Sequence, residues 1–144
     1  GFATTVALAC WGILIFLPRR PFLLSLVMYL GVGILSLTYV IGLVSVMTGA
    51  ADPGGAYARD VSFFTVEGLR AISTTDAGVV IGWIHYLAFD LFIGLWIARD
   101  ADAKRFPRVL QGIILVLVLL AGPTGLLLWL ILRERAARRA ARGQ

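Results

Sequence analysis

The sequence predicts an all-α integral membrane protein: a four-helix bundle with a short amphipathic interfacial helix between helices 2 and 3. Hydrophobic residues make up 60% of the 144 residues and charged residues 15%, and the mean hydropathy is +0.92. Soluble domains are nearer ~45–50% apolar and ~25% charged. The apolar residues form four blocks, and most charges lie between the blocks. The length suits one membrane domain, residues 1–144.

The first two blocks predict two membrane spans joined by a tight turn. The first covers residues 2–17, slightly fewer than the ~20 residues that a ~30 Å hydrocarbon core needs. The sequence Pro18-Arg19-Arg20-Pro21 follows, and proline disfavours helix in the residue before it. The second span, residues 22–47, is long enough to cross a bilayer with tilt. We expect Tyr39 in this span to be a packing or interface residue rather than a catalytic one.

The long connection after the second span contains an amphipathic segment, residues 60–73. Asp60 is suited to cap a helix there, and Glu67 and Arg70 are spaced i,i+3, close enough to pair. A helix of this kind lies at a membrane surface. It serves either as a lid or spacer between spans, or as a site where Glu67 and Arg70 bind the polar end of a ligand.

The last two blocks predict spans over residues 78–98 and 109–132. Trp83 and Trp96 lie near the ends of the first of these, as in an aromatic belt. The second is interrupted by Gly122-Pro-Thr-Gly125, and we expect the proline to kink the helix. The basic tail, residues 133–144, should continue this helix among the lipid headgroups.

The positive charges do not decide the orientation of such a bundle. The formal charge is +5, and the basic residues flank the apolar blocks, which favours anionic lipids as partners. No basic patch carries interleaved aromatic residues, so we expect no nucleic-acid partner. With four spans, one side would carry six basic residues and the other seven. These two numbers are too similar for the positive-inside rule to assign an orientation.

Two ionisable residues, His85 and Asp90, fall inside the third expected span. An ionised carboxylate at membrane depth costs at least ~2.5–3.5 kcal/mol, so it needs a partner or a function. At 100° per residue, His85 and Asp90 lie about 140° apart on a helix. Asp90 shares a face with Tyr86 and Gly94, and His85 shares one with Phe89. We therefore expect the two groups to meet different neighbours.

These residues limit the chemistry that the chain offers. A metal site needs three or four ligands, and the chain has one histidine and one cysteine, so we expect no metal and no cofactor. No nucleophile-elbow motif is present. An acid–base pair acting on a lipophilic substrate fits better, because a carboxyl group removed from water favours its protonated form. The alternative is structural: Asp90 and His85 bond backbone groups, Tyr86 or an arginine.

Four segments resemble the abscisic-acid-deficient-four-like family of neoxanthin-synthase-related integral membrane proteins. They are Phe64-Thr-Val-Glu-Gly-Leu-Arg70, Gly82-Trp-Ile-His-Tyr-Leu-Ala-Phe-Asp90, Gly94-Leu-Trp-Ile-Ala-Arg-Asp100 and Gly122-Pro-Thr-Gly-Leu-Leu127. The resemblance covers nearly the whole chain, and the segment around His85 and Asp90 is its most specific part.

The resemblance implies a role in carotenoid chemistry. The plant members are tied to neoxanthin synthesis, in which a violaxanthin epoxide is isomerised to an allenic alcohol. On this basis we expect Asp90 to be the catalytic acid and His85 the base, with Glu67 and Arg70 at the ring end of the substrate. The expected substrate-binding residues also include Tyr86, Trp83 and Phe89. The substrate would be a carotenoid or another apolar isoprenoid.

Two other functions are compatible with the same residues. The first is a non-catalytic accessory subunit of a larger membrane assembly, such as a photosynthetic pigment–protein complex, with other subunits or further copies of this chain as partners. The second is a carotenoid carrier that binds without chemistry. In each case we expect a multi-pass protein of a bacterial inner membrane.

Overall fold

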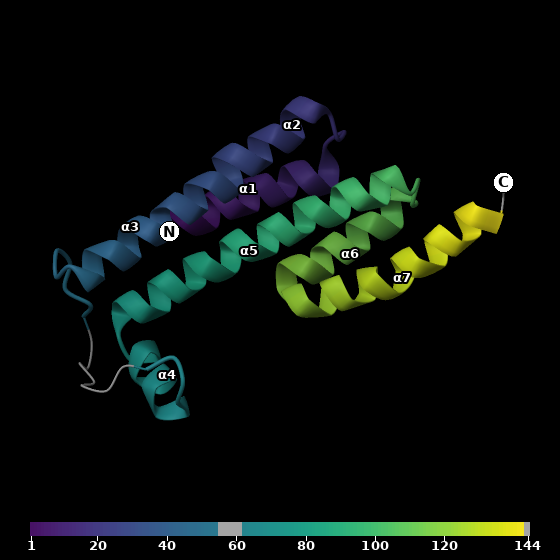
Figure 1. The fold of residues 1–144 in the computed structure, drawn as a ribbon. Coiled ribbons are helices and arrows are strands. Elements are labelled where there is room, and N and C mark those ends of the chain that lie inside the picture. The colour runs from purple at the N-terminus through teal and green to yellow at the C-terminus, as the bar shows by residue number, and fades with distance from the viewer. Residues whose placement is uncertain (55–61, 143–144) are drawn as a thin grey trace.

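The computed structural model describes residues 1–54 and 62–142, and the regular elements in these ranges are all helical (Figure 1). In chain order they are α1 (Phe2–Phe16), α2 (Pro21–Leu26), the π-helical segment η1 (Val27–Gly33), α3 (Ile34–Met47), α4 (Val66–Ser73), α5 (Asp76–Ala103), α6 (Arg108–Leu120) and α7 (Gly122–Arg142). The prediction of an all-α protein is confirmed for this part of the chain.

Helix α5 is the centre of the structure. Helix α1 and the continuous helix formed by α2, η1 and α3 lie on one side of it, and α6 and α7 lie on the other (Figure 1). Small residues allow the close packing with α1. A Cβ atom at position 94 would lie 2.8 Å from Cζ3 of Trp11, and one at position 31 would lie 2.6 Å from Sγ of Cys10. The core lies where α1, η1, α6 and α7 pack against the second half of α5.

Within residues 1–54 and 62–142, two helices are long and apolar enough to cross a membrane: Pro21–Met47 and Asp76–Ala103. The first exposes large apolar side chains along its length, from Phe22 (73% exposed) to Met47 (77%). A continuous apolar surface of this kind is typical of a face that contacts lipid. Helices α1 and α6 are also apolar but shorter.

The fourth predicted span differs most from the structure. Residues 109–132 do not form one kinked helix, because the chain leaves α6 at Ala121 (φ −154°, ψ 75°) and α7 returns antiparallel to α6. Pro123 lacks a backbone N–H and suits the first turn of a new helix better than a helix interior. The 13 residues of α6 extend about 20 Å, less than a ~30 Å hydrocarbon core. The expected single kinked helix over residues 109–132 is therefore wrong, since a helical hairpin takes its place, and the four-helix membrane bundle is not confirmed.

Helix α4 is shorter than predicted. It begins at Val66, where Thr65 Oγ1 accepts a hydrogen bond of 3.1 Å from the N–H of Gly68. Thr65 is thus the capping residue in the structure. Residues 60 and 61, where the helix was expected to begin, lie outside the described residues.

Helix α5 is longer than predicted. Thr75 caps its start, accepting a hydrogen bond of 3.0 Å from the N–H of Gly78, and the helix continues through residues 99–103, beyond the predicted end at residue 98. Asp100 supports this extension, because it pairs with Lys104 one turn later and with Nε of Arg133 at 2.8 Å. The indole N–H of Trp129 also donates to Asp100, at 3.1 Å.

A buried arginine joins three segments at this end of α5. Nη1 of Arg19 donates to the carbonyl oxygen of Ala98 (2.8 Å), to Oδ1 of Asp102 (2.9 Å) and to Oε1 of Gln111. The Arg19 side chain is only 5% exposed. Burial lowers the pKa of its guanidinium group from the ordinary value, and the Asp102 carboxylate opposes that change. Arg19 thereby holds together the turn between α1 and α2, the end of α5 and the start of α6.

Candidate ligand-binding site

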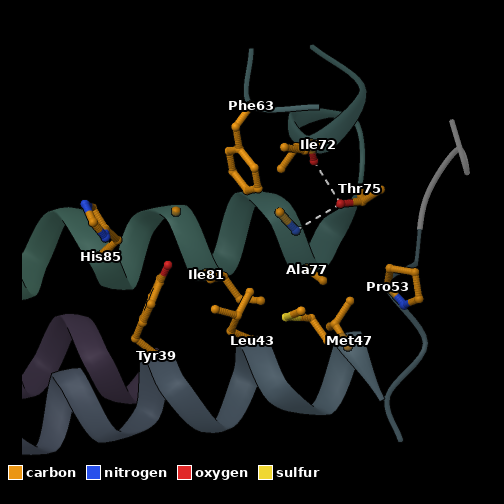
Figure 2. Close-up of a pocket in the computed structure, with 13 residues that line it drawn as sticks. Tyr39, Leu43, Met47, Pro53, Phe63, Ile72, Thr75, Ala77, Ile81 and His85 are labelled. Atoms are coloured by element: carbon orange, nitrogen blue, oxygen red, sulfur yellow. Dashed lines mark hydrogen bonds between the residues drawn. The ribbon is translucent and has the colours of Figure 1, made fainter. Parts of the chain in front are cut away.

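A cavity of about 550 Å³ lies between α3, α4 and the first half of α5 (Figure 2). Its size is within the range of small-molecule sites, ~300–1,000 Å³. Most of the lining side chains are apolar. The lining residues are Tyr39, Leu43, Val46, Met47, Pro53, Phe63, Ile72, Thr75, Ala77, Gly78, Ile81, Gly82 and His85.

Among the polar side chains that line the described part of the cavity, those without a hydrogen-bond partner lie at one end. The rings of Tyr39 and His85 meet there, with centroids 5.4 Å apart and planes tilted by 55°. Neither side chain hydrogen-bonds to any residue in the described part of the chain. The hydroxyl of Thr75, farther along, is already engaged: it donates to the carbonyl of Ile72 and accepts from the N–H of Gly78 (Figure 2). A ligand would therefore find free hydrogen-bonding groups at the Tyr39–His85 end.

Two glycines of α5, Gly78 and Gly82, determine the shape of the cavity. A Cβ atom at position 78 would lie 2.9 Å from the carbonyl carbon of Ile72, so Gly78 allows the end of α4 to approach α5 closely. At Gly82, by contrast, a Cβ atom would meet nothing within 4 Å. The absence of a side chain at Gly82 therefore leaves space in the cavity rather than room for a neighbouring helix.

A smaller hollow of about 250 Å³ continues along the seam between α3 and α5. It is lined by Val32, Ser36, Ala88, Phe89 and Phe92. Phe89 connects it to the main cavity, because its ring stacks on His85 with centroids 4.6 Å apart. His85 thus lies between two apolar hollows on one face of the molecule.

Asp90 lies in different surroundings. It is 6% exposed and faces the hairpin tip, where a Cβ atom at position 122 would lie 2.7 Å from its Cγ. Tyr86 interacts with both the Asp90 carboxyl group and the backbone of Gly122. Oδ2 of Asp90 has no hydrogen-bond partner among the described residues, and Asp90 lines neither hollow. The helical geometry correctly predicted that His85 and Asp90 meet different neighbours.

Of the other expected site residues, only Phe89 lies beside His85. Trp83 donates from Nε1 to Thr4 Oγ1 (3.1 Å) and stacks on Tyr86, and neither of the two stacked residues lines the cavity. Glu67 and Arg70 are exposed on α4 and form no ion pair with each other in the described part of the chain. Helix α4 instead contributes Ile72 to the cavity.

Tyr39 lines the cavity but is not among the expected site residues. We expected it to be a packing or interface residue; its ring contacts His85, and its hydroxyl points from α3 towards α5 (Figure 2). The signal available was its spacing, since Tyr39, Leu43 and Val46 share one helical face and all three line the cavity. No group of three or more His, Cys, Asp or Glu side chains suited to a metal occurs in residues 1–54 and 62–142.

Comparison with known proteins identifies the family. The family model described as ABA DEFICIENT 4-like matches residues 1–129, from the start of α1 into α7. No curated protein and no solved structure matches the chain. The match confirms the resemblance seen in the four sequence segments. The chain therefore belongs to the ABA DEFICIENT 4-like family and is a neoxanthin-synthase-related membrane protein.

Proposed function

We propose that this protein binds a carotenoid or a related isoprenoid along the seam between α3 and α5, with an oxygen-bearing ring end against Tyr39 and His85. The observation that carries the proposal is the cavity of about 550 Å³, which is apolar except for free hydrogen-bonding groups at one end. A long apolar molecule with a hydroxyl or epoxide group matches this distribution.

The proposed ligand also accounts for the aromatic residues beside His85. Phe89 and Phe92 line the second hollow and are both partly exposed along the same seam. A polyene is flat and apolar, and aromatic side chains offer it a large contact area. The chain of the ligand would lie over these rings, and its polar end would reach the main cavity.

The same groups support an acid–base isomerisation as the chemical step. Converting an epoxide to an allenic alcohol requires a proton delivered to the epoxide oxygen and a proton removed from the carbon chain, so no atoms are gained or lost. We assign the proton donor to the Tyr39 hydroxyl and the base to the His85 imidazole. Tyr39 takes the acid role expected of Asp90, because Asp90 lines neither hollow.

Pigment retention tests the binding step. The protein would be produced in a carotenoid-making bacterial host and purified in mild detergent, and the extracted pigment would be measured per mole of protein. We expect bound carotenoid with the natural sequence. Gly82→Leu should fill the cavity and reduce the bound pigment at least about tenfold, which corresponds to roughly 1.4 kcal/mol of binding free energy.

Gly112→Leu is the matched control, because a Cβ atom at position 112 on α6 also meets nothing within 4 Å. It should leave the pigment content unchanged. Equal pigment in Gly82→Leu and the natural sequence would refute binding in this cavity. A pigment-free protein with a stoichiometric protein partner would favour the accessory-subunit function instead.

Product analysis tests the chemical step separately. With an epoxy-carotenoid supplied, Tyr39→Phe and His85→Gln should retain pigment and lose the isomerised product. Bound pigment that the natural sequence returns unaltered would identify a carrier rather than an isomerase.

A further inference from the structure

The hairpin places the basic tail at the same end of the molecule as two other basic segments. Helix α7 returns along α5 until Arg133 pairs with Asp100 near the end of α5. The turn after α1 reaches the same place, because Arg19 pairs with Asp102. We call this region the basic end, and it comprises residues 17–21, 99–108 and 133–142.

The two ends of the molecule differ strongly in charge. The basic end carries Arg19, Arg20, Arg99, Lys104, Arg105, Arg108, Arg133, Arg135, Arg138, Arg139 and Arg142, against three acidic residues, Asp100, Asp102 and Glu134. The sequence between α3 and α5, together with the first turn of α5, carries two basic residues, Arg59 and Arg70, against Asp52, Asp60, Glu67 and Asp76. The excess of positive charge is therefore concentrated at one end.

Many of the positive groups at the basic end are available to a partner. Arg19, Lys104 and Arg133 form ion pairs within the molecule. Four others, Arg20, Arg99, Arg105 and Arg108, are exposed. Exposed arginines at the end of two long apolar helices suit the anionic headgroups of phospholipids.

We propose that the basic end contacts the anionic phospholipids of the cytoplasmic leaflet, and that the cavity lies nearer the opposite side of the membrane. Basic residues near the ends of spans favour the cytoplasmic side. The basic end carries eleven basic residues, and the opposite end carries two. If residues 109–132 formed a single fourth span, the two sides of the membrane would carry six and seven basic residues. The proposal needs only Pro21–Met47 and Asp76–Ala103 to cross the bilayer, and it does not depend on the ligand.

Labelling of single cysteines tests the topology. The sole natural cysteine, Cys10, is buried, so the unmodified chain is the control that should not react. Three exposed positions would each receive a cysteine: Ser73→Cys at the end of α4, Ala103→Cys at the end of α5 and Glu134→Cys in the tail. A membrane-impermeant maleimide would be applied to spheroplasts of a bacterial host, and permeabilised cells would report the full reactivity of each position.

We expect Ser73→Cys to react in intact spheroplasts, and Ala103→Cys and Glu134→Cys to react only after permeabilisation. If Glu134→Cys behaves like Ser73→Cys, α7 ends on the opposite side and the hairpin topology is refuted. If Ala103→Cys and Glu134→Cys both react in intact spheroplasts, the proposed orientation is refuted.

The lipid contact has its own measurement. The melting temperature of the purified protein would be compared in micelles containing phosphatidylglycerol or phosphatidylcholine. We expect a larger increase with phosphatidylglycerol, and a smaller gain for the variant carrying Arg135→Gln and Arg138→Gln or in high salt. An equal increase with both lipids would refute recognition of the anionic headgroup.

Discussion

The two halves of α5 are surrounded very differently. Among residues 76–85, all of them described, Ile84 alone is buried, and this half borders the cavity. From Asp90 to Ala101, by contrast, most residues are buried against α1, α6 and α7. Residues 90–101, the packed half, fix the position of the helix. Residues 76–85, the open half, can then border a space that the neighbouring helices do not fill. The following substitutions test this difference.

The largest effect is expected from a large side chain in the packed half. Gly94→Leu would drive a side chain into the ring of Trp11, which is 1% exposed, and should destabilise the protein by about 3 kcal/mol or more. Gly82→Leu in the open half makes the same chemical change and should leave the free energy of unfolding within about 0.5 kcal/mol. Unfolding by SDS in mixed micelles would measure both, and equal losses would remove the distinction between the halves.

A smaller loss is expected from the arginine that holds the packed half at its end. Arg19→Met would leave Asp102 and the side-chain oxygen of Gln111 without this donor, and should cost about 2 kcal/mol. Arg20→Met, at the exposed neighbouring position, should cost less than about 0.5 kcal/mol. Matching losses for the two variants would show that the buried contacts of Arg19 do not stabilise the fold.

The smallest loss is expected at the hairpin tip, where the two halves of α5 meet. Gly122→Ala would place a methyl group against the Asp90 carboxyl group and should cost about 1 kcal/mol. In a chain that already carries Asp90→Ala, Gly122→Ala should cause a smaller loss of stability, because the carboxyl group that opposes the new methyl group is absent. A double-mutant cycle measures this coupling, and strictly additive losses would contradict the contact.

The parts of the structure that depend on one helix alone were predictable from the sequence. The long apolar blocks correctly predicted the helices around Tyr39 and His85, and the angular spacing correctly separated His85 from Asp90. The hairpin was not predictable, because Gly122-Pro-Thr-Gly125 inside an apolar block suits either a kink or a reversal. Only the packing of the tip on α5 distinguishes the two.

The cavity was not predictable for a similar reason. It requires α4 to fold against α5 at Gly78 while Gly82 stays uncovered, and both are relations between helices. Asp90 was expected to be the acid because the resemblance implies proton transfer and because the carboxyl group lies in an apolar segment. Neither observation determines whether a side chain points into a cavity.

The reversal at Ala121 also determines the shape of the protein within a bilayer. From Asp90 to Asp102, about 18 Å along α5, the helix is accompanied by α6 and α7 as well as α1. On the other side of Asp90 neither α6 nor α7 continues. If Pro21–Met47 and Asp76–Ala103 cross the bilayer as proposed above, the hairpin would displace additional lipid only from the half of the bilayer that holds the basic end.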